Sequence, residues 1–205
     1  MEPLLIKNFL PDDVLNFVNS YCVLKFSNER KFRDVDFQAT TLIGEYSDIV
    51  METLLDMSTP VIEGNVSKKL FPTYSYLRCY DLGSDLPVHT DRESCEYTVA
   101  LCLGCDPIDK PYEIFLGEQD DASDYKYYNS KKEYTHLKVL HKFAMKRNDA
   151  LIFKGLDFLH WREYCKHDHY ITAFLHYVDQ EGEYKDCKFD KREILGAEAV
   201  QSTKY

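Results

Sequence analysis

The order of hydrophobic patterns along the chain constrains its fold most, because helical spacing comes first and strand-like runs follow Lys69. Apolar residues recur with helical spacing from Asp12 to about Leu24, and again from Ser47 to about Val66. From residue 70 to about 179 the chain shows short β-prone runs separated by turns. This order predicts a mostly β fold with N-terminal helices, either a β-sandwich or a jelly roll.

The chain has 205 residues, of which 44% are hydrophobic, which is enough for one sizeable core. We therefore expect a single domain, with a helical layer over about 1–69, a β core over about 70–179 and a polar tail over 180–205. The tail is expected to pack loosely or to form a helix. Ser47 or Asp48 is expected to cap the second helix, and Pro60 to break or kink it.

The formal net charge of −10 disfavours binding to nucleic acid or to an anionic membrane. The sequence starts without a secretory signal and has no apolar run long enough to span a bilayer. Its 7 cysteines are an odd number. These features favour reduced thiols and a cytoplasmic location. Cys102 and Cys105 have the spacing of a redox or zinc pair, but no second pair accompanies them, so we expect buried, inert thiols.

A candidate metal motif lies at His89-Thr90-Asp91. In an extended segment, residues two apart point to the same face, so the imidazole and the carboxylate aim at one point. Together they make two thirds of a 2-His-1-carboxylate facial triad. Alone the pair is weak, because a surface histidine beside a turn aspartate explains it equally well. A third ligand, His160, follows a strand-like run that ends in a turn at Gly155.

With this context the chain resembles the 2-oxoglutarate- and Fe(II)-dependent oxygenases, specifically their prolyl-4-hydroxylase-like branch. The similarity covers roughly residues 4 to 179. It rests on the opening Ile6–Pro11 before a helix, on Tyr76–Tyr80, Leu86–Asp91, Asn148–Gly155 and His160–Glu163, and on the strand to Asp179.

The resemblance implies that His89, Asp91 and His160 bind Fe(II) on a double-stranded β-helix (jelly roll). It also implies 2-oxoglutarate as co-substrate and O2 as oxidant, with succinate and CO2 released as a substrate is hydroxylated. Halogenating relatives replace the carboxylate ligand with a small residue. Since Asp91 is present, hydroxylation is the expected chemistry.

The cation for the distal carboxylate of 2-oxoglutarate is where the chain departs from the family. Relatives carry Arg or Lys around nine positions after the distal histidine, and here that position is His169. Arg162 is the candidate substitute, with a surface ion pair to Glu163 as the alternative. His169 or Thr172 is a further candidate. Relatives also place a co-substrate-binding tyrosine where Tyr80 stands, so we expect that role for Tyr80, with a core tyrosine as the alternative.

Substrate contacts are expected from Tyr76, Arg78 and Trp161, of which Trp161 either shields the metal or simply packs. We expect the loops at 27–38 and 117–135 to select the substrate, with Tyr125–Tyr128 as either a lid or an ordinary loop. A prolyl or other protein residue is the first candidate substrate, and a peptide or small molecule is also compatible. We expect His167 and His169 to belong to a polar hairpin, and His136, His141 and His176 to be ordinary histidines.

Two other functions fit the same residues. The first is a cupin-like metal-binding protein with the same ligands but no 2-oxoglutarate, which the missing Arg at position 169 would favour. The second is a non-catalytic jelly-roll binding module in which the histidines are structural. Turnover of 2-oxoglutarate that depends on Fe(II) distinguishes the oxygenase from both.

Overall fold

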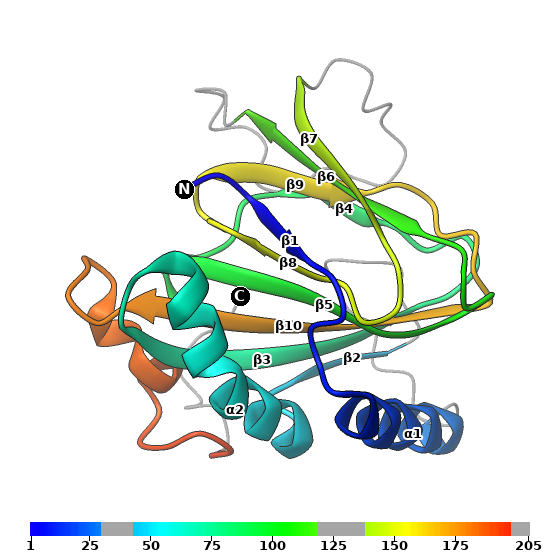
Figure 1. Cartoon of the computed structure of the whole chain (residues 1–205), viewed down its shortest axis with the longest axis horizontal. Coiled ribbons are helices and arrows are strands. Elements are labelled where there is room, and N and C mark those ends of the chain that lie inside the picture. Colours follow the sequence, from blue (N-terminus) through cyan, green and yellow to red (C-terminus); the bar gives the residue numbers. More distant parts are fainter. Residues whose placement is uncertain (30–42, 119–137, 198–205) are drawn as a thin grey trace.

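The computed structural model describes residues 1–29, 43–118 and 138–197, and it confirms a mostly β fold with helices near the N-terminus (Figure 1). The loop residues expected to select the substrate fall largely outside these ranges, as do Tyr125–Tyr128 and His136. In chain order the elements are β1 (Leu4–Ile6), α1 (Asp12–Glu29), β2 (Ile43–Tyr46), α2 (Ile49–Val66), β3 (Leu70–Tyr80), β4 (Leu86–His89), the 3-10 turn η1 (Glu93–Cys95), β5 (Tyr97–Asp106), β6 (Tyr112–Glu118), β7 (Val139–Met145), β8 (Ala150–Phe153), β9 (Phe158–Arg162), β10 (His169–Asp179) and the 3-10 turn η3 (Lys185–Lys191).

Two antiparallel sheets face each other and form the jelly roll. The larger has the order β1-β8-β5-β10-β3-β2, and the smaller has the order β4-β9-β6-β7. The strands β1 and β2 come from the stretch expected to be a helical layer, and they form the two edges of the larger sheet. Figure 1 shows both helices on the outer face of the larger sheet, with the smaller sheet on its other side.

Alternation along the strands separates two apolar regions. The outer face of the larger sheet packs on the helices, so that Leu15 and Leu55 share a cluster with Leu77 and Ile171. The inner face meets the smaller sheet, where Phe153 and other inward residues pack against Ile114, Leu116 and Met145. Residues that share a face with this inner cluster are therefore held between the sheets, away from bulk water.

The second helix begins as predicted but does not end where proline was expected to break it. Asp48 is its N-cap, because its carboxylate accepts hydrogen bonds from the backbone N–H groups of Val50 and Met51, both at 3.0 Å. The helix reaches Val66, as its apolar spacing predicted, and continues through Pro60, so of the predicted break or kink the break is wrong. The exposed Pro60 is followed by the fully buried Ile62, whose packing on the core continues the helix past it.

The segment after β10 packs closely on the barrel up to residue 197, so the expectation of a loose tail is wrong. Asp190 accepts two hydrogen bonds from the Arg92 guanidinium, at 2.6 and 2.7 Å, and one from Tyr46 at 2.6 Å. Arg192 donates to both carboxylate oxygens of Glu52, at 3.0 and 3.1 Å, and the two side chains are almost completely buried. Polar contacts with distant parts of the chain therefore hold this segment.

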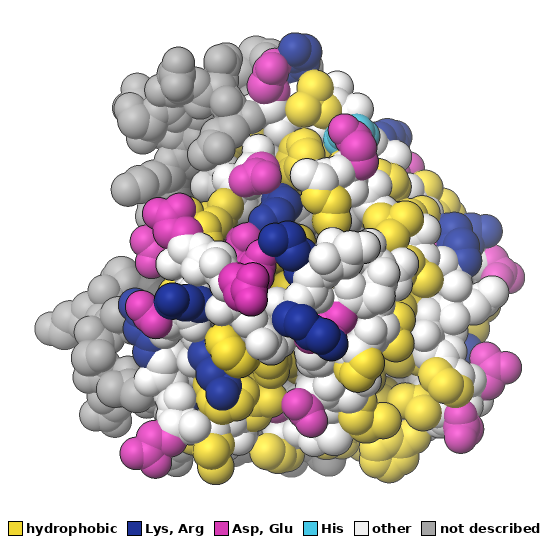
Figure 2. Space-filling view, turned by 60° about the vertical axis from the view of Figure 1, so that its left-hand side comes forward, with side chains coloured by type: hydrophobic (Ala, Val, Ile, Leu, Met, Phe, Trp, Pro, Cys, Tyr) yellow, Lys and Arg dark blue, Asp and Glu magenta, His cyan; other side chains and the backbone are white. Residues whose placement is uncertain are grey.

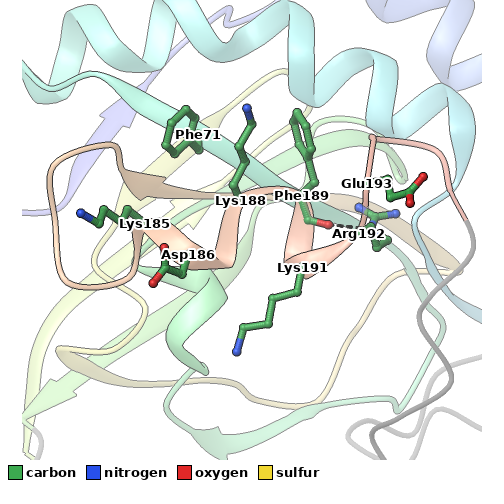
Figure 3. Close-up of a pocket in the computed structure, with 8 residues that line it drawn as sticks. All are labelled: Phe71, Lys185, Asp186, Lys188, Phe189, Lys191, Arg192 and Glu193. Carbon is green, nitrogen blue, oxygen red and sulfur yellow. Dashed lines mark hydrogen bonds between the residues drawn. The ribbon is translucent and has the colours of Figure 1, made fainter.

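The surface offers no single charged face among the described residues in the view of Figure 2, where basic side chains lie among acidic and apolar ones. A hollow lies beside η3, lined by Phe71, Phe189 and several lysines (Figure 3). Lys185, Lys188 and Lys191 point in different directions there, so their charges do not converge on one ligand.

All 7 cysteines are buried and none forms a disulfide. This agrees with the expectation of free, buried thiols for Cys102 and Cys105. Within the described ranges, no helix combines the length and the apolar character that crossing a bilayer requires.

Candidate metal centre

The structure brings together the three side chains predicted to bind a metal. His89 ends β4, Asp91 lies two residues further on, and His160 lies on β9. The two strands pair with His89 opposite His160, so the imidazole rings lie side by side with centroids 4.2 Å apart. Asp91 Oδ1 lies 3.5 Å from His160 Nε2 and 3.8 Å from His89 Nε2.

The hydrogen bonds of the two histidines leave the correct nitrogens available to a metal. His89 Nδ1 lies 2.8 Å from the carbonyl oxygen of Pro87, and His160 Nδ1 lies 3.1 Å from that of Phe158. A carbonyl oxygen only accepts, so each Nδ1 carries the hydrogen and each Nε2 presents a lone pair toward Asp91.

The spacing of the three donor atoms fits one ion. All lie within 4.8 Å of one another. Donors that share an ion at about 2.1 Å, at right angles, lie roughly 3 Å apart. A small contraction therefore closes the site around a metal. Two neutral imidazoles and one carboxylate on one side of the ion are the donor set of non-haem Fe(II) sites.

The surroundings of His89 and Asp91 favour the protonation states that bind metal. Burial, and after it the neighbouring His160, lower the pKa of His89 to about 3. Burial alone would raise the pKa of Asp91, but His160, His176 and His89 around it outweigh that effect and hold the pKa well below its ordinary value. A neutral imidazole and an ionised carboxylate are the forms that bind a metal ion.

Gly155 leaves room for the loop that carries the candidate ligand Asp91. The backbone N–H of Asp91 donates to the Gly155 carbonyl oxygen at 3.0 Å. A Cβ at position 155 would collide with Asp91 Oδ2, and would come within 2.6 Å of the Cys95 carbonyl oxygen and 2.7 Å of Thr98 Oγ1. The glycine turn noted in the sequence therefore makes room for the carboxylate ligand.

Substitution Gly155→Ala is expected to weaken Mn(II) binding by at least about tenfold, because the methyl group displaces Asp91. It should also lower the free energy of unfolding by about 1 to 3 kcal/mol, the usual cost of overpacking. Gly64→Ala in α2 is the control, since a Cβ there meets nothing within 4 Å. Calorimetric titration and thermal denaturation measure the two effects. Wild-type stability and affinity in Gly155→Ala would contradict this assignment.

Arg162 lies between the sheets on β9, two residues after His160, and is fully buried. Its guanidinium donates to the carbonyl oxygens of Tyr112 and Glu113, at 3.1 and 3.3 Å. Tyrosine rings surround it, with centroids 4.7 to 5.7 Å from the guanidinium carbon, and belong to Tyr112, Tyr170 and Tyr80. Within the part of the chain that the structure describes, no carboxylate pairs with it. A surface ion pair with Glu163 is therefore excluded.

Three buried polar atoms on Arg162 and on two residues of the facing sheet lack hydrogen-bond partners among the described residues. They are Arg162 Nε, the Tyr80 hydroxyl and Thr172 Oγ1. Tyr80 and Thr172 lie on neighbouring strands, β3 and β10, where Thr172 is opposite Arg78 and Tyr170 is opposite Tyr80. Buried polar groups normally have partners, so this group is suited to a polar ligand.

The remaining predicted residues divide between the two faces of their strands. Arg78 is buried, and its guanidinium lies 4.9 Å from the Tyr76 ring centroid and 5.6 Å from that of Phe174, which belongs to the inner cluster. Trp161 lies on the opposite face of β9 from His160, where its ring stacks on Phe115 at 5.4 Å. This placement disagrees with a substrate or metal-shielding role for Trp161, because adjacent strand residues point to opposite faces.

His169 also lies away from the part of the barrel interior that surrounds Arg162. It starts β10, and its neighbour Tyr170 is the residue that contacts the guanidinium. Alternation then directs His169 toward the other face of the sheet. His167 of the same hairpin is buried, and its Nε2 lies 2.8 Å from the Lys110 carbonyl oxygen, which agrees with a structural role.

Two residues that the sequence did not single out form a hydrogen-bonded chain that ends on the candidate carboxylate ligand, Asp91. Thr98 Oγ1 donates to Asp91 Oδ2 at 2.6 Å, and His176 Nδ1 lies 3.1 Å from the same hydroxyl. His176 had been expected to be an ordinary histidine. Alternation from Thr172 offered a signal, since residues 172, 174 and 176 share one face of a strand.

No protein-family model matches the sequence, and no curated protein sequence matches it. Solved structures match the fold. The α-ketoglutarate-dependent carbocyclase SnoK from nogalamycin biosynthesis has a TM-score of 0.62 at 11% identity, covering 86% of this chain and 79% of its own. HygX from Streptomyces hygroscopicus, solved with nickel and 2-oxoglutarate bound, has a TM-score of 0.61 at 9% identity over 87% and 83%. A Pseudomonas putida prolyl-4-hydroxylase has a TM-score of 0.54 at 11% identity, and the match covers 85% of this chain and 91% of the hydroxylase. The chain therefore has the fold seen in 2-oxoglutarate-dependent oxygenases.

Proposed function

We propose that the protein is an Fe(II)- and 2-oxoglutarate-dependent oxygenase that hydroxylates its substrate. The overall reaction converts R–H, O2 and 2-oxoglutarate into R–OH, succinate and CO2. One observation carries the proposal: the candidate ligands His89, Asp91 and His160 share the barrel interior with Arg162, a buried cation without a carboxylate partner among the described residues. The barrel interior thus offers both a metal site and a cation that can bind the far carboxylate of a dicarboxylate.

His89, Asp91 and His160 would hold Fe(II) through two nitrogens and one oxygen on the same side of the ion. When bound, Fe(II) would activate dioxygen, and the electrons that reduce the dioxygen would come from the decarboxylation of 2-oxoglutarate and from the substrate. The residues themselves keep their ligand atoms deprotonated and fixed by backbone hydrogen bonds. Both His160 and Arg162 are buried, so the chain excludes water from the space between them.

In this proposal Arg162 binds the distal carboxylate of 2-oxoglutarate. Residues two apart on a strand are separated by about 6.6 Å, so Arg162 lies on the same face of β9 as His160 and about that distance further along the strand. The Tyr80 hydroxyl and Thr172 Oγ1 supply further hydrogen bonds to the same carboxylate. A guanidinium and two hydroxyls match a carboxylate well, and the ligand would neutralise a buried charge. His169 takes no part in this proposal, in which Arg162 replaces the cation that relatives carry at that position.

Two classes of substrate fit this proposal. Arg78 and Tyr76 line the inner face of β3 and are the proposed substrate contacts. The structures that share the fold act on different substrates by their names, since one is a carbocyclase and another a prolyl-4-hydroxylase. A prolyl or other protein residue is therefore one candidate and a small molecule another.

Binding of 2-oxoglutarate to the protein with and without Mn(II) tests the proposal. We expect one 2-oxoglutarate per chain in the Mn(II)-loaded protein and much weaker binding without metal, because the keto acid would bind both the metal and Arg162. Isothermal titration calorimetry gives both affinities. Metal binding without 2-oxoglutarate binding would favour a cupin-like protein of other chemistry. Binding of neither would leave a non-catalytic module.

A further inference from the structure

We propose that Thr98 and His176 form a hydrogen-bond relay that fixes the Asp91 carboxylate so that only Oδ1 faces the metal. The inference rests on the proposed metal site and assigns positioning roles to two residues outside it. Thr98 is on β5 and His176 is on β10, and the two are directly opposite each other in the antiparallel pairing of these strands. The register of the larger sheet therefore sets their contact.

The direction of each hydrogen bond in the relay follows from the chemistry of its members. An ionised carboxylate only accepts, so the single hydroxyl hydrogen of Thr98 points to Asp91 Oδ2, 2.6 Å away. The Thr98 oxygen is then free to accept, and His176 Nδ1, at 3.1 Å, donates to it. The relay thus runs from the imidazole N–H through the hydroxyl to the carboxylate.

This relay divides the two oxygens of Asp91 between two tasks. Oδ2 is held by the charge-assisted bond from Thr98, which is roughly twice as strong as a bond between neutral groups. Oδ1 is the oxygen that lies 3.5 and 3.8 Å from the two histidine Nε2 atoms. Rotation of the carboxylate would break the Thr98 bond. The relay therefore favours one metal-bound oxygen and leaves adjacent positions on the ion for other ligands.

The far end of the relay is itself fixed by packing. His176 is 4% exposed, and its ring lies 4.5 Å from the Tyr74 ring and parallel to that of Phe174 at 6.5 Å. The guanidinium of Arg92 lies over the ring of Tyr74, 4.4 Å from its centroid. A histidine held in this way keeps its Nδ1 directed at Thr98.

A second metal ion is the competing interpretation of this cluster. Donor atoms of Asp91, Cys95 and His176 also lie within 4.8 Å of one another. However, Thr98 Oγ1 contacts both Asp91 and His176 at hydrogen-bond distance, so the hydroxyl bridges the donors that such an ion would need. The Cys95 sulfur has its own partner in the Tyr74 hydroxyl at 3.1 Å. The geometry therefore favours the relay.

Mn(II) affinity and stoichiometry in Thr98 and His176 variants test the relay. We expect Thr98→Val to weaken Mn(II) binding by about 10- to 100-fold, and His176→Phe by about tenfold, the range typical of residues that orient metal ligands. Thr98→Ser keeps the hydroxyl and should bind within about threefold of wild type. Thr53→Val, on the exposed side of α2, is the matched control.

The outcomes separate the relay from the proposed function. A wild-type protein that binds no Mn(II) would overturn both. If the wild type binds one ion and a folded Thr98→Val or His176→Phe binds it equally well, the relay alone is wrong. Two ions per chain would likewise overturn it in favour of a second metal site. Should Thr98→Val fail to fold, His176→Phe and the rescue by Thr98→Ser decide.

Discussion

Replacing His89 with alanine is expected to weaken Mn(II) binding by roughly 100- to 1,000-fold. Structural zinc sites with four protein ligands gain roughly 10 to 16 kcal/mol, or about 2.5 to 4 kcal/mol per ligand, and 1.4 kcal/mol corresponds to a factor of ten. His89 is one of only three protein donors at the candidate site. Its Nδ1 is hydrogen-bonded to the Pro87 carbonyl oxygen, so Nε2 is the donor atom that the alanine variant removes from the site.

His141→Ala is the matched control for His89→Ala. His141 lies on β7, is partly exposed and contacts Glu2 rather than the candidate ligands. Its replacement should leave Mn(II) affinity within about twofold of wild type, as expected for a surface position. Calorimetry or the loss of the free Mn(II) electron paramagnetic resonance signal measures binding. Unchanged affinity in a folded His89→Ala protein would remove the metal site, and with it both the oxygenase and the cupin-like functions.

Replacing Arg162 with methionine is expected to weaken 2-oxoglutarate binding by at least about 100-fold while metal binding is retained. Removing one partner of a buried, hydrogen-bonded charge pair costs roughly 2 to 5 kcal/mol, which supports this magnitude. In the absence of ligand, the contacts of the buried guanidinium with the described residues are to carbonyl oxygens, a sulfur and aromatic rings. Methionine fills a similar volume without a charge, so the free protein should be as stable as wild type or more so.

Two further variants make the Arg162 result specific. Arg162→Lys keeps the charge but loses the planar pair of donors, so its 2-oxoglutarate affinity should lie between those of wild type and Arg162→Met. Arg147→Met, in the turn before β8 where Arg147 contacts Asn16, should bind 2-oxoglutarate normally. Calorimetric titration of the Mn(II)-loaded proteins gives the affinities, and thermal denaturation gives the stabilities. Normal 2-oxoglutarate affinity in Arg162→Met would assign the distal carboxylate to another group.

Local patterns in the sequence were sufficient for the parts of the site that lie within a few residues of one another in the chain. The spacing of His89 and Asp91 predicted a shared face, and the two-residue step from His160 to Arg162 places both side chains between the sheets. The same alternation explains why Trp161, one residue from each, points outward. The helix cap at Asp48 was likewise readable, because capping depends on neighbouring residues only.

Features that depend on strand register were out of reach. The pairing of His89 with His160 and of Thr98 with His176 joins residues 71 and 78 positions apart, and no local signal encodes such a register. The C-terminal segment was misjudged for the same reason. Its polar composition suggested loose packing, but Asp190 and Arg192 find partners more than 90 positions away in the sequence.

Succinate formation from 2-oxoglutarate by the purified protein tests the central claim most directly. With Fe(II), O2 and ascorbate as reductant, the wild-type protein should release succinate and CO2 in equal amounts even without its natural substrate, although slowly. The rate should fall to background when Fe(II) is omitted or chelated, and in His89→Ala. Succinate at background level in a wild-type protein shown to bind both Fe(II) and 2-oxoglutarate would contradict the assignment of this barrel as an oxygenase.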